Sequence, residues 1–239
     1  MSDTVLRDAA RMLQSGNLAG AAKLYEDILR TDPRQIEALY RLGAIHLQNG
    51  RHNEAERLFA SAIKLNSGVP ELLLARGSAL HGLRRHEEAL ASFAQALALN
   101  SAYTEARHQR GVVLLDLERY AEALACFDRV ASESPGLAFV EGNRAVAFNG
   151  LQRHEEALAA AEKALALDAR FAMAWYQRGA ALASLGRNAE AVLAFDKAVA
   201  IDPKYTDAYS YRGIVLSLRS EEHTSELQSR GLISYAVFC

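Results

Sequence analysis

Histidine and glutamate stand side by side at two places in the chain, where they could bind and activate a metal ion. His86 and His154 are each followed by a glutamate and so resemble the first half of an HExxH motif. That motif holds zinc with two histidines one helical turn apart and uses the glutamate as a general base. The second histidine is missing here, because Leu90 and Leu158 occupy its position. We therefore expect these histidines, and the similarly placed His52, to be turn residues rather than metal ligands.

A row of arginines that recurs every 34 residues is the second series that could bind a ligand. One hypothesis is a track that binds an anion. The other is structural, with each arginine stem covering apolar surface while its guanidinium reaches a glutamate. We favour the structural interpretation, because an acid recurs with every base. The arginines are Arg76, Arg110, Arg144, Arg178 and Arg212, and the expected partners are Glu88, Glu122, Glu156 and Glu190.

Signatures of other enzyme classes are missing from the sequence. It contains no glycine-rich phosphate loop, no nucleophile elbow and no cluster of residues with metal-ligand spacing. Cys126 lies on an apolar helix face, where a lone cysteine usually serves packing. We therefore expect no catalytic residue, no metal and no cofactor in the region present.

The composition narrows the class of protein and of partner. The 27 lysines and arginines are balanced by 29 aspartates and glutamates, so the basic excess of a nucleic-acid-binding protein is missing. No apolar run approaches the roughly 20 residues of a membrane-spanning helix, and the first residues lack the apolar core of a signal peptide. We expect a cytoplasmic protein that binds neither nucleic acid nor membrane.

An internal repeat organises the elements that must position any site. The segment HEEALASFAQALALN from His86 returns as HEEALAAAEKALALD from His154, two periods of 34 residues later. The register is unbroken, which predicts the repeats 2–35, 36–69, 70–103, 104–137, 138–171 and 172–205 and a partial repeat 206–218. A small residue marks each period, at Ala9, Gly43, Gly77, Gly111, Ala145, Gly179 and Gly213.

Apolar residues within each repeat follow helical spacing twice, so each repeat is predicted to be a helix–turn–helix. Gly186 can end a first helix without steric cost, and Pro203 sets the turn after a second helix. Glycines such as Gly179, facing Ala191, let two helices approach closely, and an aromatic such as Phe195 fills the gap towards the next pair. A single pair cannot bury its apolar faces, so the pairs must stack. The expected fold is an all-α, right-handed α-solenoid of six full repeats plus the first helix of a seventh.

At these residues the chain resembles the tetratricopeptide repeat family, which has a small residue in the first helix, an alanine and an aromatic in the second, and a proline at the exit. The resemblance covers Ser2 to Leu218. It implies a protein that binds a protein or peptide partner along the inner surface formed by the first helices.

The inner surface is expected on the stripe opposite the buried one in each first helix, about 180° away at 100° per residue. Amides on this stripe can both donate to and accept from the backbone of an extended peptide. A solvated polar face without a ligand is the alternative. The candidate groove residues are Tyr40, Arg41, His108, Gln109, Asn143, Tyr176, Gln177 and Tyr211.

Two subclasses of the family offer more specific functions. One grips the acidic C-terminal tail of chaperones with a lysine, asparagine and arginine clamp, which this chain does not match. The other is the N-terminal arm of O-linked N-acetylglucosamine transferases, whose groove carries an asparagine in nearly every repeat. Only Asn143 fits it, with Gln109 and Gln177 as substitutes. We expect a non-enzymatic interaction scaffold, with an acceptor-selecting arm of a protein O-glycosyltransferase as the alternative.

The fourth and fifth repeats depart from the pattern. Ala161 replaces the aromatic, and Arg107 and Glu141 replace the large apolar residue of the first helix. Losing a ring weakens packing. We expect the segment 133–161 to be the softest part of the array unless Phe139 or Phe148 fills the space.

The last residues, 219–239, lack the repeat pattern. Back-translation makes Arg219–Ser229 and Ile233–Cys239 resemble a sequencing-library adapter, so we expect this segment not to be a natural domain. The helix before it would then lack its partner helix. Its face with Tyr209, Gly213 and Leu216 is expected to remain partly exposed.

Overall fold

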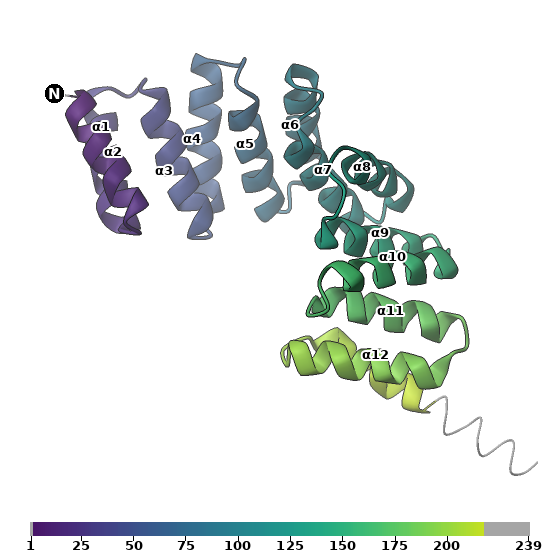
Figure 1. Cartoon of the computed structure of the whole chain (residues 1–239). Coiled ribbons are helices and arrows are strands. Elements are labelled where there is room, and N and C mark those ends of the chain that lie inside the picture. Colours follow the sequence, from purple (N-terminus) through teal and green to yellow (C-terminus); the bar gives the residue numbers. More distant parts are fainter. Residues whose placement is uncertain (1, 218–239) are drawn as a thin grey trace, which may run out of the picture. The chain divides into compact units, whose positions relative to one another are not determined.

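The computed structural model describes residues 2–217, which are helical apart from short turns and contain no strand (Figure 1). The prediction for residues 219–239 lies outside the described residues. The helices are α1 (Ser2–Gln14), α2 (Leu18–Thr31), α3 (Ile36–Gln48), α4 (His52–Leu65), α5 (Pro70–Gly82), α6 (His86–Leu99), α7 (Thr104–Asp116), α8 (Tyr120–Glu133), α9 (Ala138–Gly150), α10 (His154–Leu167), α11 (Ala172–Ser184) and α12 (Asn188–Ile201). Residues 206–217 form a further helical stretch.

The chain is divided into two compact units, residues 1–113 and 114–239. In the first unit α1 packs on α2, α3 on α4 and α5 on α6, and each pair also contacts the next. In the second unit α8 to α12 pack in the same consecutive way, and α9 also lies against α11. The predicted all-α repeat solenoid is confirmed. No helix among the described residues is both long and apolar enough to cross a membrane.

The turn inside each pair uses a left-handed residue at one fixed place in the period. Gly16, Gly50 and Gly186 have φ values of 80°, 71° and 74°, which glycine adopts without strain. The same place in the other repeats is held by Arg84, Glu118 and Gln152, with φ values of 58°, 56° and 59°. These three positions therefore keep a conformation that costs an L-residue about 1–2 kcal/mol.

The recurring glycine of the first helix makes room for the aromatic ring of the second. A Cβ atom on Gly43 would lie 2.6 Å from Phe59, and one on Gly179 would lie 2.7 Å from Phe195. Phe59 and Phe195 are fully buried. The glycine thus admits the ring of Phe195, a contact that the predicted pairing of Gly179 with Ala191 did not include. The far edge of Phe195 does reach the following repeat, where its centroid lies 6.3 Å from that of Tyr211.

The fifth repeat has an alanine where the other full repeats have an aromatic ring. Ala161 stands in the place of the aromatic, and the facing glycine is replaced by Ala145; both alanines are fully buried. Phe148 joins the same core at 7% exposure, whereas Phe139 is 41% exposed. The low stability expected for residues 133–161 stays a prediction, which hydrogen exchange tests.

The helical stretch 206–217 buries only part of its apolar surface. Ala208 and Val215 are buried, while Tyr209 and Leu216 are 45% and 40% exposed. A Cβ atom added at Gly213 would meet nothing within 4 Å. The predicted partial exposure of the face with Tyr209, Gly213 and Leu216 is therefore observed.

Candidate functional site

Tyr40 and Arg41 are the first two predicted groove residues, and α3 places them next to each other on the surface of the first unit. The Tyr40 ring is half-buried and packs on Phe59, with 6.0 Å between the centroids. The Arg41 guanidinium carbon lies 5.8 Å from the Tyr40 centroid. Its Nε is 3.7 Å from Oε1 of Glu37, which is an ion pair but too long for a hydrogen bond. Arg41 therefore keeps hydrogen-bonding capacity beside an aromatic ring.

A pocket of about 420 Å³ opens at these two residues. Its walls come from the start of α3, the start of α5 and the turn before α5. Most of the lining is apolar, with two carboxylates and one guanidinium. The lining residues are Ile36, Glu37, Tyr40, Arg41, Val69, Glu71 and Leu72. An apolar pocket with a few polar groups at its edge is the usual form of a small binding site.

His108 and Gln109 lie on α7 in the first unit. Both are half-buried. Gln109 Nε2 donates a hydrogen bond of 2.8 Å to Oε1 of Glu105. Burial lowers the pKa of His108, and the charge of Glu105 opposes this only in part. The imidazole is therefore neutral at pH 7 and offers one donor and one acceptor.

Gln177 on α11 is not open to a ligand as its place in the sequence pattern suggested. Its side chain is only 8% exposed. Asn149 on α9 donates its amide to Oε1 of Gln177 at 2.9 Å and to the Gln177 carbonyl at 3.2 Å. The position of Gln177 therefore supports packing between first helices, while Asn143 on α9 is half-buried.

Tyrosines gather at the end of the second unit. The Tyr176 ring lies 5.0 Å from Tyr205 and 5.6 Å from Tyr211, the latter edge-on, and 5.8 Å from the buried Phe195. Burial, Tyr211 and the acid Asp207 raise the pKa of Tyr176 far above the ordinary value. Two predicted groove residues, Tyr176 and Tyr211, are thus brought together, and Tyr205 joins them.

The histidines flagged by the HExxH comparison are the first residues of α4, α6 and α10. The His52 ring lies against Gly82, where an added Cβ would meet Nδ1 at 2.5 Å. His154 Nε2 is 3.2 Å from Oε1 of Gln152 in the turn. The three histidines thus follow the turns directly, as first helical residues, and the expectation that they bind no metal stays a prediction.

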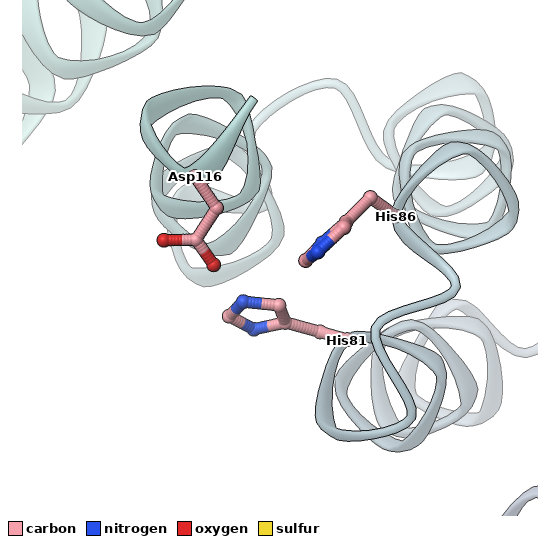
Figure 2. A group of neighbouring side chains, drawn as sticks. All are labelled: His81, His86 and Asp116. Carbon is pink, nitrogen blue, oxygen red and sulfur yellow. The ribbon is translucent and has the colours of Figure 1, made fainter. Parts of the chain in front are cut away.

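Figure 2 shows His86 facing His81, which comes from near the end of α5. Their ring centroids are 5.7 Å apart, and the planes are inclined by 55°. Asp116, labelled in the same figure, belongs to the second unit. Two imidazoles are half of the ligand set of a tetrahedral zinc site. Within either unit taken alone, the described residues bring together no three His, Cys, Asp or Glu donors at metal-binding distance.

Four of the five arginines of the row pair with acids, as the structural interpretation requires, but the partners differ from those predicted. Arg76 Nε donates to Oε1 of Glu56 at 2.9 Å, so its partner is an acid on the preceding second helix rather than Glu88. Glu88 instead accepts two hydrogen bonds from Arg85, at 2.7 and 2.6 Å. Three further arginines of the row repeat the first arrangement, in the pairs Arg144–Asp128, Arg178–Glu162 and Arg212–Asp196. Three further turn arginines repeat the second, in the pairs Arg119–Glu122, Arg153–Glu156 and Arg187–Glu190.

Glu141 is a buried charge that the sequence analysis treated only as a lost apolar residue. Its side chain is 3% exposed and is contacted by Arg144 at 2.6 Å and by Lys163. Burial raises its pKa, but the hydrogen bonds from Lys163 and Arg144 outweigh burial and hold the pKa below the ordinary value. Cys126 on α8 is buried in agreement with its predicted packing role.

Sequence profiles identify the family. Three profiles described as tetratricopeptide repeat match residues 12–77, 74–138 and 172–205, which together make up more than half of the chain. No curated protein sequence matches the chain.

Solved structures show the same fold at low sequence identity. A tetratricopeptide repeat protein from Parabacteroides merdae ATCC 43184 is 20% identical, has a TM-score of 0.78 and covers 95% of this chain and 90% of its own. MamA 41-end from Desulfovibrio magneticus RS-1 is 24% identical, with a TM-score of 0.64 and coverages of 77% and 96%. YrrB, described as a TPR protein with an unusual peptide-binding site, is 18% identical, with a TM-score of 0.64 and coverages of 80% and 99%. The chain belongs to the tetratricopeptide repeat family.

Proposed function

We propose that the chain is a protein-interaction scaffold that binds an extended peptide, and that the pocket between α3 and α5 holds one side chain of that peptide. One observation carries this proposal. Tyr40 and Arg41, selected from the sequence as groove residues, line the same pocket of about 420 Å³.

The chemistry of the pocket suits a peptide better than a small polar metabolite. Apolar groups from Val69 and Leu72 form much of the wall, so a side chain that enters leaves water. Glu37 accepts hydrogen bonds and Arg41 donates them, and the backbone of an extended peptide presents both kinds of group. YrrB, a TPR protein of the same fold, has an unusual peptide-binding site, which supports peptide binding as a function of this fold.

The affinity of one pocket is expected to be low. Burying one large apolar side chain contributes about 1.5–3 kcal/mol. Association itself costs at least about 4 kcal/mol. Contacts on neighbouring repeats must therefore add to the pocket, and a short peptide is expected to bind with a micromolar or weaker Kd.

The acceptor-selecting arm of a glycosyltransferase stays a prediction. It rests on an asparagine in the groove, and Asn143 is the single asparagine among the candidate groove residues. Gln177, one of the two substitutes, lies inside the fold. We therefore give the scaffold priority.

A selection from a random peptide library displayed on phage tests the proposal. Peptides enriched on the whole chain are synthesised, and their Kd values are measured by calorimetry for the unaltered chain and for Arg41→Ala and Tyr40→Ala. We expect both variants to weaken binding at least fivefold. The matched control is Arg57→Ala, which removes an exposed arginine from α4 of the same unit. If the selected peptides bind the unaltered chain and all three variants with the same Kd, the pocket does not take part in peptide binding.

A further inference from the structure

The pocket has an occupied counterpart in the second unit. Tyr205 stands four periods after Val69 and packs its ring on Tyr176, with 5.0 Å between the centroids. Tyr176 in turn stands four periods after Tyr40, which lines the pocket with Val69. The space beside Tyr176 in the second unit is thus filled by the ring of Tyr205. The corresponding space beside Tyr40 in the first unit is open.

Aromatic rings stand at this place in three of the six repeats, at Tyr103, Phe171 and Tyr205, and Gln35, Val69 and Leu137 hold it in the others. Phe171 lies against Gly142, where an added Cβ would meet its ring at 2.6 Å. Tyr103 packs against the core cluster of Leu73, Ala96 and Ala106 in the first unit. Val69 is smaller than any of these three rings. The pocket therefore has the place in the period that three other repeats give to an aromatic ring, and, like Tyr205, it lies beside a tyrosine of the first helix.

The size of the pocket agrees with this occupant. An apolar cavity of about 150 Å³ is enough to hold benzene. The pocket measures about 420 Å³, so a ring enters with room for the adjoining backbone. Tyr40 offers its ring, and aromatic pairs prefer centroid separations of about 4.5–7 Å. The Tyr176–Tyr205 distance of 5.0 Å lies within that range.

The acidic residues at the pocket favour an aromatic ligand that carries a hydroxyl group. Glu37 and Glu71 both line it. Asp207 stands four periods after Glu71 and, with burial as the larger cause, raises the pKa of Tyr205 to about 12. The Tyr205 hydroxyl thus stays protonated near a carboxylate. A phenol hydroxyl entering the pocket meets the same kind of acceptor in Glu71.

We propose that the pocket formed by Tyr40, Val69 and Leu72 is a subsite for a tyrosine side chain of the bound peptide, in the place that Tyr205 fills in the second unit. This inference rests on the proposed function and names the chemistry of its ligand. Glu71 accepts the hydroxyl of the incoming tyrosine. Aliphatic and lysine side chains are the competing occupants.

The test uses the whole chain, labelled with ¹³C at its methyl groups, and N-acetyltyrosinamide as the probe. The NMR signals of Ile36 and Leu72, which line the pocket, are followed during titration. We expect saturable shifts with N-acetyltyrosinamide, and at least threefold weaker binding of N-acetyl-leucinamide and N-acetyl-lysinamide. Glu71→Gln, which keeps an acceptor but loses the charge, is expected to weaken the tyrosine probe about two- to threefold.

A reciprocal pair of variants gives the control. Val69→Tyr restores the ring found at this place in other repeats and is expected to abolish the shifts. The backbone of Val69, with φ −108° and ψ 102°, is extended like that of Phe171, with φ −79° and ψ 93°, so the variant fits the same conformation. Tyr205→Val is expected to open a second site. The probe reports on that site through the methyl group of Met173, which stands four periods after the pocket residue Glu37. A melting temperature is recorded for each variant, so that a loss of fold is not mistaken for a filled pocket.

The outcomes separate this inference from the proposed function. If phage-selected peptides bind through Arg41 but N-acetyl-leucinamide shifts the pocket signals as strongly as the tyrosine probe, the scaffold stands and the tyrosine subsite is wrong. Shifts that persist unchanged in Val69→Tyr would also overturn the subsite. If neither the peptides nor the probes shift the NMR signals of Ile36 and Leu72, both proposals fail.

Discussion

Asn149 donates its side-chain amide to Oε1 of Gln177 at 2.9 Å and so joins α9 to α11 by a hydrogen bond between side chains. The acceptor is 8% exposed, and the same amide also reaches the Gln177 carbonyl. The bond therefore lies in the packing between the first helices of two repeats and not on an open wall.

Gln177→Ala is expected to lower the free energy of unfolding by about 1–2 kcal/mol, because it leaves the half-buried Asn149 amide without its side-chain acceptor. Chemical denaturation followed by circular dichroism measures the change. Gln109→Ala is the matched control, since Gln109 bonds only across one turn of its own helix to Glu105. Equal stability of the two variants would show that the Asn149–Gln177 bond contributes little.

The fold could be predicted from the sequence because one small residue per period fixes the spacing of the helices. Each first-helix glycine in contact with a ring, such as Gly179 with Phe195, repeats one local solution. Once that solution recurs in register, the stacking of the pairs follows from the need to bury both faces.

The site was less predictable, because it depends on neighbours in other repeats. A helical-wheel count treats α11 alone, so it placed Gln177 on an open face and missed Asn149 on α9. The same limitation assigned Arg76 to Glu88 in its own repeat, whereas Glu56 comes from the preceding one. The pocket did leave a weak signal in the sequence, because Val69 is small where Tyr103, Phe171 and Tyr205 stand in three other repeats.

The turns predict a stabilising substitution. Arg84 has a φ of 58°, whereas Gly50 and Gly186 hold the same place in other repeats with φ values of 71° and 74°. Arg84→Gly is expected to raise the free energy of unfolding by about 1 kcal/mol, because glycine adopts this conformation without the clash of a Cβ atom. Thermal denaturation with Arg84→Ala as control checks it: alanine removes the same side chain but keeps the strain. A gain of equal size for alanine would assign the effect to the side chain instead.

The contact between glycine and ring predicts a site that does not tolerate even a methyl group. Gly179→Ala would place a Cβ atom 2.7 Å from the fully buried Phe195. The ring must shift, and overpacking of this kind costs about 1–3 kcal/mol. Gly213→Ala offers the control, since nothing lies within 4 Å of its added Cβ atom. The melting temperature is expected to fall for the first variant and to stay or rise for the second; a fall of equal size in both would contradict the steric explanation.

The buried Glu141 predicts an acid-sensitive contribution to stability. Burial alone would raise its pKa, but hydrogen bonds from Lys163 and Arg144 hold it below the ordinary value of 4.5. A carboxyl group whose pKa is depressed in the folded state stabilises the fold above the unfolded pKa. That stability is lost as the pH falls from about 4.5 through the lower folded value.

Glu141→Gln removes this charge while keeping the shape of the side chain. We expect it to cost about 2 kcal/mol at pH 7, less than for a fully buried pair because Lys163 is 59% exposed and can return to water. Below the folded pKa the difference should disappear, since Glu141 is then also uncharged. Glu133→Gln on α8 removes a carboxylate that is 22% exposed and paired with an exposed arginine, and so serves as control. Unfolding free energies measured from pH 7 to pH 3 decide the matter: a Glu141→Gln deficit that is the same at every pH would show that packing, and not the charge, is what Glu141 contributes.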